Sequence, residues 1–298
     1  MLWHLVSTLV LLVLTQGAAA VLDVKVVAAS RNDTTPVDPS QIKLLRKEVT
    51  PSQLERLKKA GGSGGDDNSD NDKNVTRRAN PVGYSGNWCG ASQHTPTSDR
   101  FKSVTGVFTV PDLSLRPSTA TPQFVASWIG IDGANCATAL VQAGATTEIK
   151  SNGSQKSNLW FEWIPDAAYN IQNLPASPND MIRVKITATS SSQAVIVVEN
   201  LSLPATAPVS SVQISLSNGS PLCRIDAEWI VENFKINGNQ TPFGRFQDIW
   251  FQACEAKTTS GATVGINGAS MIYLQNTGPN PNCFAYEYDN TIFWAESS

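Results

Sequence analysis

Histidine is almost absent from this chain of 298 residues, since it occurs only at positions 4 and 94. A zinc site built from two or three imidazoles is therefore excluded. A serine or cysteine nucleophile activated by histidine would depend on His94 alone. The sequence also lacks G-x-S-x-G, D-T-G, D-S-G and G-x-G-x-x-G motifs and a P-loop. Any catalysis must use carboxylates, amides and hydroxyls, and we expect no metal and no organic cofactor.

Positive charge and long apolar runs are scarce as well. Residues 79–298 hold 11 Lys and Arg against 16 Asp and Glu, which argues against a nucleic-acid partner because such a partner needs a basic surface. The one long apolar run, residues 5–14, is shorter than the roughly 20 residues that cross a bilayer. Ala18-Ala19-Ala20 follows it as a cleavage pattern. We expect residues 1–20 to be a signal peptide, and the protein to be secreted, extracellular and without a membrane partner.

Residues 21–78 have the features of a pro-segment. Two stretches, 38–41 and 50–53, carry helix-start signals of a capping residue followed by proline. A Gly-rich linker at 61–65 leads to Arg77-Arg78, a dibasic processing site on an exposed tether. Residues 21–60 hold eight basic and five acidic groups. We therefore expect this basic segment to bind the acidic body and to act as its intramolecular inhibitor.

From residue 79 onward the sequence predicts one all-β domain, residues 79–298. Short β-branched and aromatic runs alternate with Asn, Gly, Pro and Ser turns, and no amphipathic helix interrupts them. Parallel topology is excluded because crossover helices are missing. The pattern favours an antiparallel sandwich or barrel. The expected strands are 104–110, 124–129, 159–164, 181–188, 194–198, 212–216, 227–231, 248–254, 271–274 and 284–288.

The cysteines and the glycosylation sequons agree with secretion. Five cysteines lie in the body, so we expect disulfides, with one thiol free or paired elsewhere. The sequence leaves their connectivity open. Four Asn-x-Ser/Thr sequons of the body stand in turn-like places. The cysteines are Cys89, Cys136, Cys223, Cys254 and Cys283, and the sequon residues are Asn152, Asn200, Asn218 and Asn239.

Two segments carry polar groups where a plain β-sandwich would be apolar. In residues 227–232, Glu228, Ile230 and Glu232 share one strand face, and Trp229 and Val231 share the other. Two carboxylates on one face, with an apolar residue between them, raise the pKa of at least one if they are buried. The run A-L-V-Q-A-G at 139–144 places a glutamine in apolar surroundings, which is costly unless its amide is used.

These segments belong to a set of motifs that resembles the glutamic peptidases, the eqolisins. The resemblance implies a concanavalin-like sandwich of two antiparallel sheets of about seven strands each. It implies an acid-active endopeptidase that cleaves protein or peptide substrates, expected as a monomer. The matching motifs are N-W-C-G-A at 87–91, S-V-T-G-V-F-T-V-P at 103–111, W-I-G-I-D-G at 128–133, A-L-V-Q-A-G at 139–144, W-F-E-W-I-P-D at 160–166 and A-E-W-I-V-E-N-F at 227–234.

The resemblance also implies the site residues. Glu228 and Gln142 would be the catalytic pair: Glu228 takes a proton from water, and Gln142 holds that water and stabilises the oxyanion. Four further motif positions would line or border the substrate cleft. They are Trp88, Trp128, Asp132 and Glu162.

Two alternatives stay open on the sequence alone. A glycoside hydrolase on a similar sandwich would pair Glu228 with Glu162 or Glu232, since such enzymes use two carboxylates. A carbohydrate-binding lectin would use the tryptophans as stacking platforms. The pro-segment favours a peptidase, because a peptidase must be held inactive in its own secretory pathway.

Overall fold

The chain is built almost entirely from β-strands. The computed structural model describes residues 22–31, 35–47, 80–95, 98–276 and 279–298. Within these ranges one 3-10 turn, η1 (Pro39–Gln41), accompanies 23 strands. Nearly all strand pairs are antiparallel; β4 and β21 are a parallel pair. The prediction of an all-β, antiparallel fold is confirmed, and each of the ten expected strands overlaps an observed one.

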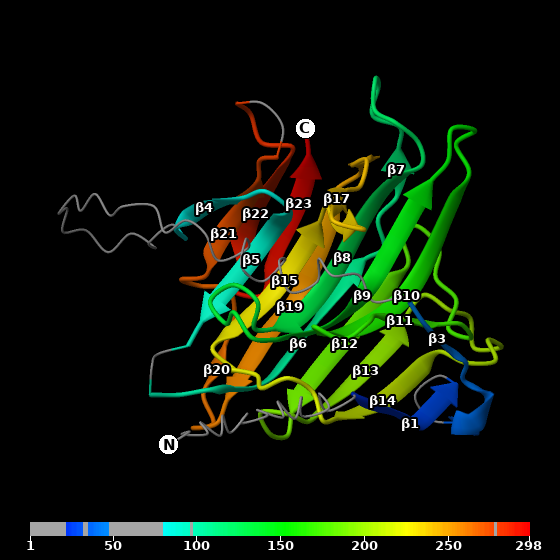
Figure 1. Cartoon of the computed structure of the whole chain (residues 1–298), viewed down its shortest axis with the longest axis vertical. Coiled ribbons are helices and arrows are strands. Elements are labelled where there is room, and N and C mark those ends of the chain that lie inside the picture. The colour runs from blue at the N-terminus through cyan, green and yellow to red at the C-terminus, as the bar shows by residue number, and fades with distance from the viewer. Residues whose placement is uncertain (1–21, 32–34, 48–79, 96–97, 277–278) are drawn as a thin grey trace, which may run out of the picture.

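Nineteen strands form one continuous sheet with two halves (Figure 1). The half that carries the site has the order β3–β11–β10–β9–β8–β15–β5–β21, with β4 beside β21. Its strands are β3 (Leu44–Arg46), β4 (Val82–Ser85), β5 (Trp88–His94), β8 (Gln123–Ile131), β9 (Leu140–Ile149), β10 (Gln155–Ile164), β11 (Tyr169–Ile171), β15 (Asp226–Glu232) and β21 (Ser270–Leu274).

The second half has the order β22–β23–β19–β6–β12–β13–β14–β1–β2, with β20 beside β19. Its strands are β1 (Asp23–Arg31), β2 (Thr35–Val37), β6 (Phe101–Thr109), β12 (Met181–Ala188), β13 (Ala194–Asn200), β14 (Ser211–Ser217), β19 (Ile249–Thr258), β20 (Thr263–Val264), β22 (Cys283–Asp289) and β23 (Ile292–Ser297). Two short pairs stand apart: β7 (Leu113–Ser114) with β18 (Arg245–Phe246), and β16 (Lys235–Ile236) with β17 (Asn239–Gln240).

The prediction of two separate sheets of about seven strands is wrong in its sheet count. The two halves join where Leu274 of β21 pairs with Cys283 of β22. The sheet is also longer than expected, because β1 and β3 come from the expected pro-segment and add strands at its two open edges. These edges present unpaired backbone donors and acceptors, and an added strand satisfies them.

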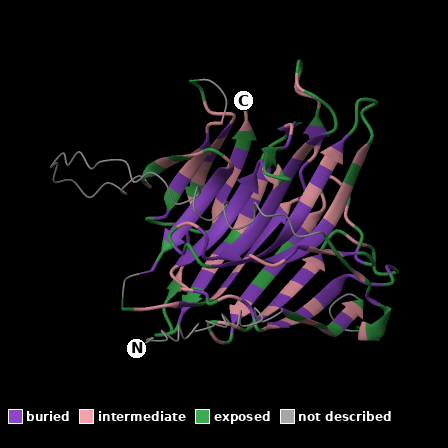
Figure 2. Ribbon diagram, in the orientation of Figure 1, coloured by how far each residue is buried: buried purple, intermediate pink, exposed green. Residues whose placement is uncertain are grey.

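The main core lies where the two halves pack on each other. β8 and β15 contact β6, and the Trp229 indole N–H donates to the Thr105 carbonyl across the interface at 2.9 Å. Along β15, Ala227, Trp229 and Val231 enter this core, while Ile230 belongs to a separate apolar cluster on the opposite face. The alternation predicted for this strand is therefore confirmed. Figure 2 shows the central strands buried along most of their length.

The expected pro-segment differs from its helix prediction where the structure describes it. Asp38 caps only the three-residue turn η1, through the Ser40 N–H at 2.9 Å, and the chain then continues as β3. The second helix signal, at 50–53, lies outside the described residues. Strand pairing with β11 and β14 outweighs a short helical preference here, because an isolated short helix is marginal in water.

Candidate active site

The polar side chains of the site form one row across four neighbouring strands. Glu228 on β15 pairs with Gly130 on β8, Gly130 pairs with Gln142 on β9, and Gln142 pairs with Glu162 on β10. Directly opposed residues of an antiparallel sheet project from the same face. Glu228 and Gln142 therefore share a face with only a glycine between them. The residue between the two predicted catalytic side chains therefore carries no side chain of its own.

Glu228 is fully buried, and its two carboxylate oxygens differ. Oε1 accepts the Ala134 N–H at 3.0 Å, whereas Oε2 has no hydrogen-bond partner among the described residues. Burial raises the pKa of Glu228 well above its usual range, the charges of Asp226 and Asp132 raise it further, and the Ala134 N–H lowers it. A carboxylate in such a place is a strong proton acceptor once it is ionised.

Gln142 is also buried, with 2% of its surface exposed. Its amide Nε2 donates to Glu162 Oε2 at 2.8 Å, which orients the side chain. The carbonyl Oε1 has no partner among the described residues, and the amide keeps a second N–H. Glu162 therefore acts on the site by orienting Gln142. Gln142 and Glu228, the predicted catalytic pair, thus each present one oxygen atom that can accept a hydrogen bond.

Two predicted tryptophans pack beside the row. The rings of Trp88 and Trp128 meet edge to face with centroids 5.1 Å apart. Trp128 Nε1 donates to Glu232 Oε2 at 2.9 Å, and Asn87 Nδ2 donates to Glu232 Oε1 at 3.3 Å. Glu232 is thereby fixed on the same face as Glu228, as the strand alternation predicts.

Asp132 occupies a tight turn directly after β8. Its φ of 72° lies in the left-handed region, and its carboxylate accepts the backbone N–H groups of Arg224 at 2.7 Å and Ile225 at 2.8 Å. Burial raises the pKa of Asp132 to about 6. The structure thus places Asp132 as a link between two loops behind Glu228, and its role in substrate binding stays a prediction.

A cavity of about 450 Å³ opens over this face. Gln142, Glu162 and Glu232 line it, while Glu228, Trp88, Trp128 and Asp132 are not among its lining residues. Its wall also includes residues that the sequence did not single out: Lys47, Phe124, Ala126, Thr146, Glu148, Asn158, Trp160, Ala168, Asn170, Phe234, Lys235, Ile236 and Asn237.

Trp160 and Asn170 are the most informative of the missed residues. They are paired across β10 and β11, and Trp160 Nε1 and Asn170 Oδ1 are buried atoms without a hydrogen-bond partner among the described residues. The sequence signal for Trp160 was its place in the W-F-E motif, two residues before Glu162 on the same strand face. Asn170 carried no such signal, because its position depends on the β10–β11 pairing.

Two disulfides join segments that are far apart in the sequence. Cys136 pairs with Cys223, and Cys89 pairs with Cys283. Cys254 is the free, buried thiol of the described residues, so the expectation of disulfides with one cysteine left over is confirmed. The Cys136–Cys223 bond ties the loop after β8 to the segment before β15.

Within the described ranges, no three His, Cys, Asp or Glu side chains are grouped so that they could hold a metal ion. The part of the chain that the structure describes also contains no helix long and apolar enough to span a bilayer. The chemistry that the observed groups can perform is proton transfer by Glu228, together with hydrogen bonding by the Gln142 amide.

Comparison with known proteins assigns a family to this arrangement. Residues 86–291 match the Peptidase A4 family. The chain is 34% identical over 213 residues to aspergillopepsin-2 of Aspergillus niger. The matched region covers 65% of this chain and 72% of that protein. It is 30% identical over 192 residues to scytalidopepsin B of Scytalidium lignicola, covering 62% and 68% respectively.

The fold matches a solved peptidase structure as well. Scytalido-glutamic peptidase, solved with a transition state analog inhibitor, superposes with a TM-score of 0.61 at 26% identity. The match covers 72% of this chain and 98% of that one. Together these similarities decide between a peptidase and the glycoside hydrolase or lectin alternatives, in favour of the peptidase.

Proposed function

The chain belongs to the Peptidase A4 family and is a glutamic-type endopeptidase, and we propose that Gln142 and Glu228 activate the water that hydrolyses its peptide substrates. One observation carries the proposal. Gln142 Oε1 and Glu228 Oε2 are buried oxygen atoms without a hydrogen-bond partner in the described part of the chain, on side chains that share a face across a glycine. Buried polar atoms are rarely left unpaired, and those that are often serve a functional role.

In the proposed reaction, Glu228 transfers the proton and Gln142 holds the water and the oxyanion. Glu228 Oε2 takes a proton from a water held between it and Gln142 Oε1, and the water oxygen attacks the carbonyl carbon of the scissile bond. The second Nε2 hydrogen of Gln142 stabilises the oxyanion. Glu228 then gives its proton to the leaving nitrogen as the C–N bond breaks. Glu228 must be ionised to take up this proton, so its raised pKa opposes the first step and favours the return of the proton to the leaving nitrogen.

The test compares two variants with matched changes elsewhere on the protein. Glu228→Gln keeps the size of the side chain but cannot take the proton, so it should abolish peptide hydrolysis. Gln142→Ala should lower kcat by about 100-fold to 1,000-fold, as expected for the loss of an oxyanion donor. Glu255→Gln and Gln252→Ala make the same changes on β19, away from the site, and should leave kcat unchanged. An active Glu228→Gln enzyme would refute the assignment.

The proposal extends to how the enzyme is made. Residues 1–20 are proposed as a signal peptide, 21–78 as a pro-segment and 79–298 as the peptidase body of a secreted precursor that works in acid. The body so defined contains the whole of the family match at 86–291. We further propose that the pro-segment inhibits the enzyme by lying along the edge of the cleft.

The contacts of residues 43–47 support this inhibitory role. β3 pairs with the edge strand β11, and the Lys47 N–H donates to the Ala168 carbonyl at 2.7 Å. The Lys47 ammonium stands 5.9 Å from the Trp160 ring centroid. Lys47 also lines the same cavity as Gln142, Glu162 and Glu232. A cation at an acidic cleft is favourable, and a substrate would have to displace it.

A further inference from the structure

The loop from Asp132 to Cys136 supplies the one hydrogen bond that the Glu228 carboxylate accepts from the residues that the structure describes. Ala134 lies in the middle of this loop, and its N–H reaches Glu228 Oε1 at 3.0 Å. The position of that N–H decides which carboxylate oxygen is occupied and which is left for water. The residues that hold the loop therefore act on the catalytic group.

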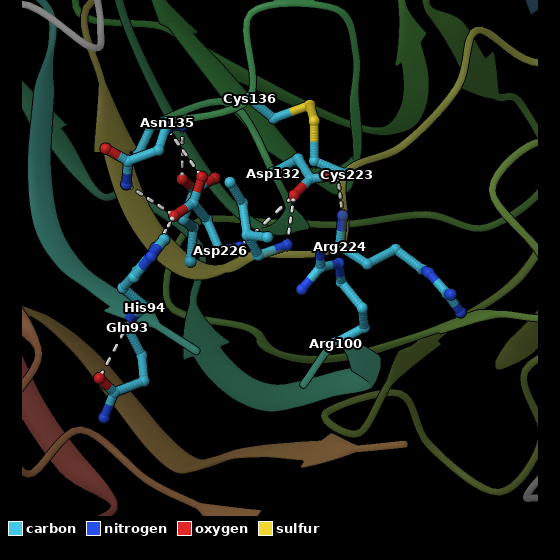
Figure 3. A network of polar contacts seen from close by, with 12 residues as sticks. Gln93, His94, Arg100, Asp132, Asn135, Cys136, Cys223, Arg224 and Asp226 are labelled. Atoms are coloured by element: carbon cyan, nitrogen blue, oxygen red, sulfur yellow. Dashed lines mark hydrogen bonds and ion pairs between the residues drawn. A yellow bond between two sulfur atoms is a disulfide. The ribbon is translucent and has the colours of Figure 1, made fainter. Parts of the chain in front are cut away.

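Asp226 holds the loop at the residue next to Ala134. Its carboxylate is fully buried and accepts two hydrogen bonds from Asn135, from the backbone N–H to Oδ2 and from the side-chain Nδ2 to Oδ1, both at 2.7 Å. Figure 3 shows Asn135 and Asp226 pointing toward each other. Hydrogen bonds to an ionised carboxylate are stronger and more directional than neutral ones. This pair therefore fixes the backbone immediately after Ala134.

His94 approaches Asp226 from the neighbouring strand. The two residues pair across β5 and β15, and His94 Nδ1 lies 2.9 Å from Asp226 Oδ1 (Figure 3). Asp226 is fully buried, whereas 51% of the His94 side chain is exposed. His94 therefore places a ring nitrogen within hydrogen-bond distance of the buried Asp226 carboxylate.

The two ends of the loop are held by other groups. Asp132 accepts the backbone N–H groups of Arg224 and Ile225, and Cys136 is bonded to Cys223. The loop would therefore remain attached without Asp226. What Asp226 adds is the orientation of the Ala134–Asn135 backbone between these two attachments. Its effect should fall on the reaction more than on folding.

We propose that Asp226 is a positioning residue of the hydrolytic reaction: through Asn135 it sets the Ala134 N–H on Glu228 Oε1 and leaves Oε2 directed at water, with His94 as its neighbour on β5. The proposal rests on the proposed role of Glu228. It explains why a buried acid is placed two residues before the catalytic one, although the charge of Asp226 opposes the ionisation of Glu228.

The first test is Asn135→Ala, which removes one of the two bonds to Asp226 and keeps the backbone N–H. We expect Asn135→Ala to lower kcat per folded active site by about tenfold relative to the wild type, and to leave KM within twofold of the wild-type value. Asn179→Ala is the matched control, because it removes a similar bond, Asn179 Nδ2 to Asp112 Oδ2 at 2.9 Å, away from the site. A merely structural role would lower the yield or thermal stability of Asn135→Ala and leave its kcat unchanged.

The pH profile gives a second readout of the same variant. The Ala134 N–H lowers the pKa of Glu228, so weakening that bond should move the acid limb of kcat/KM to higher pH. The Asn135→Ala substitution leaves the other ionisable groups near Glu228 unchanged. These groups are Asp132, Asp226, His94, Glu162 and Glu232. An acid limb that does not move would count against the proposal.

A double-mutant cycle tests whether the effect passes through Ala134. Proline at this position lacks the N–H, so Ala134→Pro removes the bond to Glu228 directly. If Asp226 and Asn135 act through that bond, adding Asn135→Ala to Ala134→Pro should produce no further loss of kcat. Independent, multiplying losses would overturn the proposal. If Ala134→Pro does not fold, Asp226→Asn replaces it in the cycle with the same expectation.

Glu228→Gln in the same assay separates the two hypotheses. If Glu228→Gln is inactive and Asn135→Ala matches the wild type in kcat and pH profile, the positioning role fails while the catalytic assignment stands. If Glu228→Gln keeps wild-type activity, the proposed function itself fails.

Discussion

Glu228 is a carboxyl group without solvent contact, and it keeps one hydrogen bond, from the Ala134 N–H. A neutral or apolar side chain would be more stable in that place, because burial and the nearby charges of Asp226 and Asp132 oppose ionisation. The catalytic group is therefore a source of instability that the rest of the fold offsets. Such a conflict between stability and activity is common at functional sites.

This conflict predicts a pH-dependent gain in stability for Glu228→Gln. The pKa of Glu228 is raised in the folded state, so its contribution to stability is fully present below the pKa of the unfolded chain and is lost as pH rises toward the folded value. The variant cannot ionise. Its free energy of unfolding should equal that of the protein with Glu228 near pH 4 and exceed it by roughly 1–2 kcal/mol near pH 7.

Urea unfolding from pH 4 to 7 measures the difference. Both proteins should carry Gln142→Ala, so that self-digestion does not distort the comparison. Glu255→Gln, at a position exposed to solvent on β19, is the control and should show no such trend. A difference that stays constant with pH would contradict the raised pKa of Glu228.

At the scale of elements, β8 separates the catalytic strands and contributes a glycine at the critical register position. Gly130 lies between Glu228 and Gln142, and a Cβ there would come within 3.0 Å of Trp128 Cζ3 and Leu140 Cδ1. The strand therefore keeps β9 and β15 at a fixed separation, and Trp128 and Leu140 already pack against the Gly130 position. Strand register, set by long-range pairing, produces this arrangement.

Gly130→Ala should therefore impair catalysis more than stability. The added methyl group would shift Trp128 or enter the space proposed for water, and kcat should fall by about 100-fold, the scale of a misplacement near 1 Å. Gly106→Ala is the matched control, because its Cβ would meet Ile129 Cδ1 and a Trp229 ring atom at the same 3.0 Å, on the core side. Steady-state kinetics on both variants measure whether kcat falls in Gly130→Ala alone.

The control separates crowding from catalysis. Both substitutions should lower the unfolding free energy by about 1–3 kcal/mol, as overpacking does. Only Gly130→Ala should lose kcat per folded molecule. If Gly106→Ala loses as much, or if Gly130→Ala keeps wild-type kcat, the glycine has no special role in the site.

At the scale of the whole molecule, the proposed pro-segment contacts both halves of the sheet. β1 pairs with β14 at the edge of one half, and β3 pairs with β11 at the edge of the other. Removing the segment would expose two strand edges and the part of the cleft that Lys47 lines. The proposed inhibition by this segment would therefore combine strand addition with electrostatic attraction.

We expect a synthetic peptide of residues 21–60 to inhibit the mature enzyme, and to do so less well in acid and in high salt. The peptide is basic and the cleft is acidic, so protonation of carboxylates near pH 4 and ionic screening both weaken the attraction. Lys47→Ala in the peptide should raise the inhibition constant several-fold. Lys25→Ala removes the same charge from β1, away from the cleft, and should have a smaller effect.

Inhibition assays across pH and salt provide the measurement. An inhibition constant indifferent to both conditions would refute the electrostatic account. Equal effects of Lys47→Ala and Lys25→Ala would refute the specific contact with the cleft, and a peptide that does not inhibit would refute the inhibitory role altogether.

The sequence by itself determined the all-β class of the body and the identity of the family. Periodicity of two in residues 227–232 separates the face of Glu228 from the face of Trp229, because side-chain alternation is a local property of any strand. Because histidine is nearly absent, carboxylates, amides and hydroxyls are the candidate catalytic groups. The shared motifs then gave the family, which the comparisons confirm.

Only the tertiary structure decided which residues meet. The row through Glu228, Gly130 and Gln142 depends on the register between strands that are far apart in sequence. The same holds for the disulfide pairs, for the Asp226–Asn135 contact, and for the strand conformation of residues 44–46, which depends on pairing with β11. Alternation within a strand is fixed by its own backbone, whereas register is fixed by packing across the whole chain.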